Sequence, residues 1–397
     1  MRNRILIKWM LLGFILIIVI GNHAKASEYH ENTTQSLEEE YYRSFYESVD
    51  LDDLSDTLYG INKKYGLSGN VSFTEYYHLL VNGNIDEAIA LAFNDFLNDM
   101  TSELLSNRDI ITKLLVLIII AAIFNNYSSI LKFSFVGEQG FFVTYLMIAV
   151  LLMQSFMLIY GVAQDTIYYI KDIMMCMLPA FYMSLVLCSG LTTSQMVNSM
   201  FFTMLTLLER VLLSVVLPGI RIYFLIVVLN QMNQKDRFSK LASLIKQGLQ
   251  FVLKAMVTGI IGLNVMKSIL IPVYDNAKYN VLQKGLSVVP GGASLSGLST
   301  ILVGAGVLIK NSVGLTVIIV LLILAGVPLL KLFCFFMVYK ILLALVQPIS
   351  DTRILAGIQG AADGAGLLLR ATTTSIILSI LSIAVVLLTT NVKLYAG

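Results

Sequence analysis

Long apolar runs, separated by prolines and short polar segments, fill most of the chain after residue 110. Two of them, Val313–Val327 and Leu332–Val346, are each long enough as a helix to cross or nearly cross the ~30 Å hydrocarbon core of a bilayer. Pro328 lies between them, and proline lacks the N–H that a helix needs and crowds the preceding turn. The pattern therefore predicts a membrane hairpin whose two helices meet at Pro328.

The same pattern predicts further spans on both sides of this hairpin. Two stretches rich in basic and polar residues, Asn230–Lys246 and Gln347–Asp363, are expected to be loops with amphipathic character. The other predicted spans are Ile110–Phe124, Gly140–Val162, a span from Pro179 to Cys188, a run that begins at Glu209 and is broken at Pro218, a weaker stretch from Pro290 to Ile309, and the spans Phe251–Ile271 and Leu367–Leu388. We expect an all-α polytopic membrane protein with about eight to ten transmembrane helices.

The order of these features predicts an internal duplication. Residues 110–172 would hold the first two spans, residues 173–285 one repeat unit and residues 286–397 a second unit. Pro179 and Pro290 are 111 residues apart, Pro218 and Pro328 are 110 apart, and Arg237 and Arg353 are 116 apart. Internal repeats are common in transport folds, but apolar runs also align by coincidence, so both interpretations stand.

The first 26 residues have the pattern of a signal peptide. Arg2, Arg4 and Lys8 form a basic start, an apolar stretch follows, and Ala24-Lys25-Ala26 is a small-x-small cleavage site. An uncleaved anchor helix is the alternative. In either case residues 27–109 are exported.

The exported segment, residues 27–109, is acidic and is expected to hold about three short helices. Ser72-Phe73-Thr74-Glu75 resembles a capping box, and Ile85–Leu105 has apolar residues at helical spacing. Because so short a segment builds only a small core, we expect it to pack against a partner or the membrane surface.

Composition and charge agree with this division. Apolar residues make up 57% of the chain and charged residues 13%, so a polytopic membrane protein is favoured over a soluble domain. Residues 27–109 carry 17 acidic and 4 basic side chains, whereas residues 110–397 carry 8 acidic and 19 basic ones. The acidic segment and the basic membrane body therefore belong in different environments.

The residue types needed for catalysis are not gathered in the membrane body. Its three cysteines lie in apolar runs without a CxxC spacing, and all three histidines precede residue 110. No HExxH motif, nucleophile elbow or Walker sequence occurs. We expect neither enzymatic activity nor a cofactor or metal site.

Polar residues inside apolar runs are the candidate functional residues, because they are costly in a bilayer. They are candidates for lining a pore or for packing, and Pro218 and Pro328 are candidate hinges. The full set is Glu209, Arg210, Lys310, Asn311, Lys331, Lys340, Gln347, Asp351 and Arg353. The adjacent Glu209-Arg210 is interpreted as a structural ion pair or as part of a transport path. The lysines either line an anion-selective passage or extend their amines to the interface.

Glycines recur at Gly357, Gly360, Gly364 and Gly366. Small residues allow helices to approach closely, so this stretch is expected to serve packing or a hinge, with gating as the alternative.

The central hairpin also carries a resemblance. The sequences LIKNSVG (308–314), VPLLK (327–331) and VYKILLALVQPISDTRI (338–354) resemble the C-terminal half of the stage III sporulation protein AE family of endospore-forming Firmicutes. Upstream, VSFTEYYHLLVNGNIDEAIALAF (71–93) agrees, and the resemblance runs from about residue 40 to 390.

The resemblance implies a mother-cell protein of the outer forespore membrane that is needed for forespore development. Its partners would be the other products of the same operon, namely ring-forming proteins, a cytoplasmic ATPase and small membrane subunits, together with the channel protein on the forespore side. The lipid bilayer and a homo-oligomer are further expected partners, and nucleic acid is not. The resemblance favours a channel subunit; a self-sufficient secondary transporter and a non-conducting scaffold for ring proteins are the alternatives.

Overall fold

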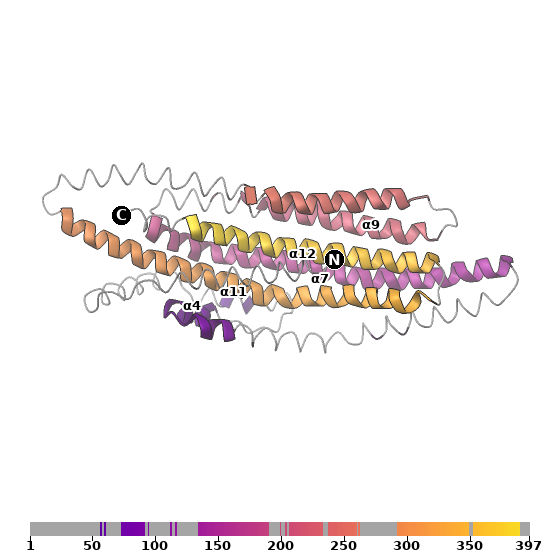
Figure 1. Ribbon diagram of the computed structural model, residues 1–397, viewed down its shortest axis with the longest axis horizontal. Helices are drawn as coiled ribbons and strands as arrows, with labels where there is room; N and C mark the ends of the chain where they lie inside the picture. Colours follow the sequence, from indigo (N-terminus) through magenta and orange to yellow (C-terminus); the bar gives the residue numbers. More distant parts are fainter. Residues whose placement is uncertain are drawn as a thin grey trace.

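The computed structural model describes residues 73–91, 134–189, 206–232, 237–259, 292–348 and 352–389, together with isolated positions outside these ranges. These residues are helical and contain no strand. The long helices lie side by side along one axis, as Figure 1 shows. The all-α prediction is confirmed.

Within the described ranges, three long helices pack against one another. Helix α7 covers Ser134–Ser189, α11 covers Gly292–Val346 and α12 covers Thr352–Thr389. At 1.5 Å per residue, α7 and α11 are each about 80 Å long. The predicted hairpin at Pro328 is therefore wrong, because both of its apolar runs belong to the single helix α11.

Neither proline inside these helices ends its helix. Pro328 lies within α11 and Pro179 within α7, so the predicted span that begins at Pro179 is part of a longer helix. Asp165, Lys171 and Asp172 also lie inside α7. A proline removes one intrahelical hydrogen bond, and packing against neighbouring helices offsets that loss at Pro328, which is buried.

The predicted break at Pro218 is a local change of helix type. A π-helical turn, η2 (Leu212–Val216), leads directly into α9 (Leu217–Asn230), and Pro218 lies in the first turn of α9. The helix continues through this position, since the backbone N–H of Leu217 donates to the carbonyl of Leu212 in the π-helical turn, and such turns occur as single-turn bulges inside α-helices. The hinge role of Pro218 and Pro328 stays a prediction.

The two predicted loops are mostly helical. The side chain of Asn230 accepts hydrogen bonds from the backbone N–H groups of Arg237 (3.2 Å) and Phe238 (2.9 Å), which closes a tight connection. A helix over residues 239–259 follows, so Lys246 is helical. After a short turn at Gln347, α12 begins at Thr352 and includes Arg353.

The order of contacts fixes the direction of the helices. A Cβ atom on Gly314 of α11 would meet Leu387 of α12, and one on Gly366 of α12 would meet Phe336 of α11. The N-terminal part of α11 thus faces the C-terminal part of α12, so the two helices are antiparallel. Gly357 faces Tyr145 and Gly364 faces Phe156, so α7 and α12 run in the same direction. Helix α9 lies beside α12, as Figure 1 shows.

The bundle contains two successive apolar cores along its axis. The first lies among the N-terminal part of α7, α9, residues 239–259, the C-terminal part of α11 and the N-terminal part of α12. The second joins the other ends of α7, α11 and α12 to α4. We call these parts of the bundle the first half and the second half.

Helix α4 (Phe73–Val81) belongs to the second half. Tyr76 and Tyr77 are fully buried in the same core as Val313–Ala325 of α11. Gly83, with φ of +80°, turns the chain into a helix over residues 85–91. The described part of the predicted exported segment thus packs on α11 of its own chain. Its packing against a partner or the membrane surface stays a prediction.

Four helical stretches in the described ranges are long and apolar enough to span a membrane: Tyr145–Pro179, Thr206–Asn230, Asn311–Val346 and Thr352–Ala384. The chain is therefore an all-α polytopic membrane protein. The predicted signal peptide 1–26 lies outside the described residues, as does almost all of the predicted span Ile110–Phe124. The predicted total of eight to ten helices and the repeat units stay predictions.

Candidate functional site

An ion pair joins α7 to the start of the span that contains α9. The ammonium nitrogen of Lys171 lies 3.8 Å from Oε2 of Glu209. The other carboxylate oxygen of Glu209, Oε1, is buried and has no hydrogen-bond partner. Arg210 is exposed. The predicted pairing of Glu209 with Arg210 is thus wrong, since neighbouring residues of a helix point in different directions.

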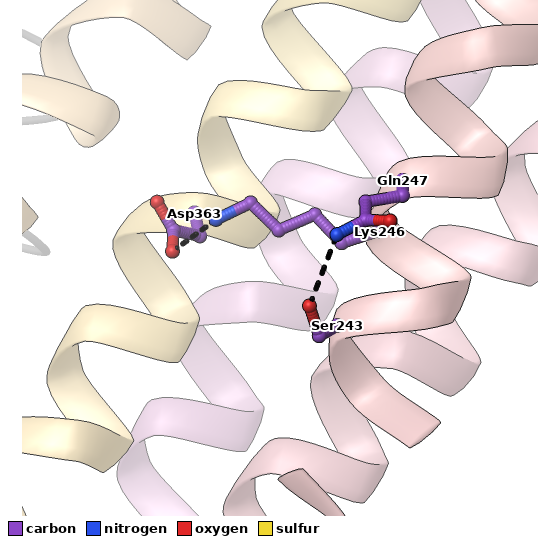
Figure 2. A network of polar contacts seen from close by, with 4 residues as sticks. All are labelled: Ser243, Lys246, Gln247 and Asp363. Carbon is purple, nitrogen blue, oxygen red and sulfur yellow. Dashed lines mark hydrogen bonds and ion pairs between the residues drawn. The ribbon is translucent and has the colours of Figure 1, made fainter. Parts of the chain in front are cut away.

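A second and shorter ion pair lies in the first half of the bundle. Nζ of Lys246, on the helix over residues 239–259, lies 2.6 Å from Oδ2 of Asp363 on α12. Figure 2 shows Lys246 reaching across to α12, while Gln247 on the same helix donates a 3.4 Å hydrogen bond to Ser243. The two ionic side chains are 29% and 20% exposed, so the pair is largely removed from solvent.

Sequence reasoning missed this pair. Lys246 and Asp363 were each expected at the end of a loop, and no partner was predicted for either. A signal was present, because Asp351 and Asp363 are the two acidic residues of the chain after residue 275. A lone carboxylate among alanines and glycines in an apolar helix requires a cation nearby.

Glycines bring the neighbouring helices close to Asp363. A Cβ atom on Gly360 would overlap Val227 of α9, and one on Gly364 would lie 2.8 Å from Phe156 of α7. The Phe156 ring stacks on Phe224 with centroids 3.9 Å apart. The packing interpretation of these glycines is confirmed, and α12 contacts α7, α9 and α11.

Two hydroxyl groups and a lysine lie near Asp363 in position along the bundle axis. Ser155, next to Phe156, hydrogen-bonds to the hydroxyl of Tyr339 on α11. Lys340 follows Tyr339, is partly buried, and has its ammonium 5.9 Å from the centre of the Phe336 ring. Because Phe336 faces Gly366, Lys340 lies near the level of Asp363. No carboxylate among the described residues pairs with Lys340.

The other predicted site residues do not join this level. Asn311, whose Oδ1 is buried without a partner, begins the 36-residue span that ends at Val346. Lys331 is partly buried in the middle of α11, and Gln347 is exposed in the turn. Lys310 lies in α11, but its side chain is not described, and Asp351 is outside the described residues. The predicted set is therefore spread along the bundle and is not gathered in one place.

The described residues contain no group of three histidine, cysteine, aspartate or glutamate side chains that could hold a metal ion. The chemistry within the described part of the bundle consists of ion pairs, hydroxyl hydrogen bonds and a partly buried lysine.

These observations define a class: a polytopic helical membrane protein with charged groups inside a glycine-packed bundle. The sequence model of the family described as Stage III sporulation protein AE matches residues 71–390, and the chain belongs to that family. The resemblance noted from the sequence is confirmed, and membership makes this a membrane protein of a sporulation family.

One curated relative matches at low identity. The protein named Stage III sporulation protein AE of Bacillus subtilis (strain 168) is 19% identical over 355 residues, which cover 86% of this chain and 87% of the relative. No solved structure matches the chain.

Proposed function

We propose that the chain is a multispanning subunit of a secretion-like channel complex that joins mother cell and forespore. Its family supports the sporulation context, and its fold supports a role within a membrane. The proposed partners are the ring-forming proteins, the ATPase and the small membrane subunits of the same operon, together with the forespore-side channel protein. The proposed location is the outer forespore membrane, and no catalytic role is proposed.

The observation that carries this proposal is the group of charged side chains near Asp363 in the first half of the bundle. A lysine without an ion-pair partner among the described residues, Lys340, lies in a candidate span near the level of the Lys246–Asp363 pair. Charged groups within a membrane are kept where they pair or where they line a polar path. The Lys246–Asp363 pair satisfies the first condition, and we assign Lys340 to the second.

Charge reversal at Lys340 tests the proposal. Lys340→Glu is expected to lower the number of heat-resistant spores by about tenfold or more, because a reversed charge at a constriction opposes the passage of the same solute. Protein level and co-purification of partners should be unchanged. Lys240→Glu, the same substitution at an exposed lysine near the start of the 239–259 helix, is the control and should sporulate normally.

Two outcomes would replace this function by an alternative. A non-conducting scaffold would be favoured if Lys340→Glu sporulates normally while other substitutions in the bundle abolish co-purification of the partners. Substrate uptake by the purified protein alone in proteoliposomes, abolished by Lys340→Glu, would favour a secondary transporter.

A further inference from the structure

The candidate spans are longer than a bilayer is thick. Asn311–Val346 has 36 residues and Tyr145–Pro179 has 35. At 1.5 Å per residue they extend over about 50 Å, against a hydrocarbon core of ~30 Å. The usual tilt of ~20° changes the length needed by only a few ångströms. A large part of each span therefore lies outside the hydrocarbon.

Charged side chains mark one boundary at the second half of the bundle. Lys171, Asp172 and Glu209 gather between α7 and the start of the neighbouring span, with Arg210 exposed beside them. The helices packed on α11 at this half also carry exposed acidic groups, which belong in water rather than in lipid. These are Glu75, Asp86 and Glu87.

A basic boundary lies at the opposite end of the first half. Arg237 and Lys240 are exposed around the connection that follows α9, and Arg353 lies in the first turn of α12. Both connections lie at the same end of the bundle, as Figure 1 shows. From Glu209 to Asn230 the chain rises about 30 Å, which is the thickness of the hydrocarbon core.

Large exposed apolar side chains gather between these two boundaries. They come from α7, the span containing α9, residues 239–259 and the C-terminal part of α11. The set is Met147, Val150, Val215, Ile222, Leu229, Leu241, Leu244, Phe251, Phe333, Ile341 and Leu345. We call this set the apolar belt.

The second half of the bundle is also apolar, but its apolar side chains are covered by protein. Along α11, residues 316–321 are buried on every side by protein, and Leu322 is the large exposed apolar side chain of the described α11 residues in that half. A helix that is apolar all round needs a protein cover or lipid, and here α4, α7 and α12 provide the cover.

Two of the charged side chains inside the belt have local partners. Lys246 pairs with Asp363, and the guanidinium of Arg221 lies 5.9 Å from the centre of the Tyr160 ring. Lys254 is exposed, and its long stem allows the amine to reach toward the nearer boundary.

We propose that the hydrocarbon core of the bilayer surrounds only the first half of the bundle, at the apolar belt. The second half, with α4 docked on α11, projects beyond the hydrocarbon as a helical extension with its own protein core. The occupant of the belt is lipid acyl chain. This placement does not depend on what, if anything, the protein conducts.

Tryptophan fluorescence in lipid tests this placement. Trp9 is the one tryptophan of the chain, so Trp9→Phe provides a silent background. Phe333→Trp and Leu322→Trp form a matched pair on one face of α11, at sites 40% and 36% exposed. In vesicles of phospholipid brominated on the acyl chains, the tryptophan at 333 should lose about half of its emission and the one at 322 very little.

Phe251→Trp provides an independent belt position on another helix, and it should be quenched like position 333. Each variant is compared with the Trp9→Phe parent for helical content and elution volume. Equal quenching at 322 and 333 would overturn the proposal, because the whole of α11 would then lie in lipid. Absence of quenching at both 333 and 251 would also overturn it, because another protein copy would then cover the belt.

Discussion

At the scale of single residues, glycine on α12 determines how closely the helices approach. Gly360 leaves no room for a methyl group beside Val227, whereas Gly161 of α7 faces open space. Gly360→Ala should lower stability by about 1–3 kcal/mol through overpacking. Gly161→Ala should raise it by up to about 1 kcal/mol through helix propensity. Thermal unfolding in detergent measures both, and equal effects would contradict the packing described for α12.

The Lys246–Asp363 pair gives a second prediction at this scale. Asp363→Leu alone should destabilise the protein by about 1–3 kcal/mol, because it leaves a partly buried ammonium without its partner. The double variant with Lys246→Met should recover most of that loss, since an apolar pair of similar volume is tolerated in place of a buried ion pair. Chemical unfolding of the two singles and the double gives the coupling energy. A coupling near zero would mean that the pair does not hold the 239–259 helix to α12.

At the scale of elements, the continuity of α11 is the sharpest difference from expectation. Leu322 and Ile341 are both exposed on α11, on either side of Pro328. In a continuous helix their Cα atoms are about 28 Å apart. Spin labels at these positions, in a background with Cys176, Cys188 and Cys334 replaced by alanine, should give a pulsed electron resonance distance near that value. A hairpin at Pro328 would give a much shorter one.

Apolar periodicity identified the helical class and most of the helical residues, but it could not place the ends of the helices. Proline was interpreted by its effect on an isolated helix, and here burial among other helices offsets the lost hydrogen bond at Pro328. Segments rich in basic and polar residues were interpreted as loops, although Lys246 lies in a helix and pairs with Asp363. Pairing across 117 residues depends on tertiary structure, which no local pattern contains.

At the scale of the whole molecule, α4 connects the N-terminal segment to the bundle. Tyr76 and Tyr77 are fully buried against α11. Tyr76→Ala should release α4, because truncating a buried aromatic side chain costs about 3–5 kcal/mol. Limited proteolysis should then cut near the turn at Gly83 while the bundle stays intact. His78→Ala, at an exposed position of the same helix, is the control and should resist cleavage like the parent protein.

The central claim is that this bundle works as a membrane subunit of a larger sporulation complex. Native affinity purification of the tagged protein from sporulating cells, followed by mass spectrometry, tests it most directly. We predict that the cytoplasmic ATPase and the ring-forming proteins of the same operon co-elute at near-stoichiometric levels. Recovery of the protein alone, or as a homo-oligomer only, from mild detergent would contradict the claim.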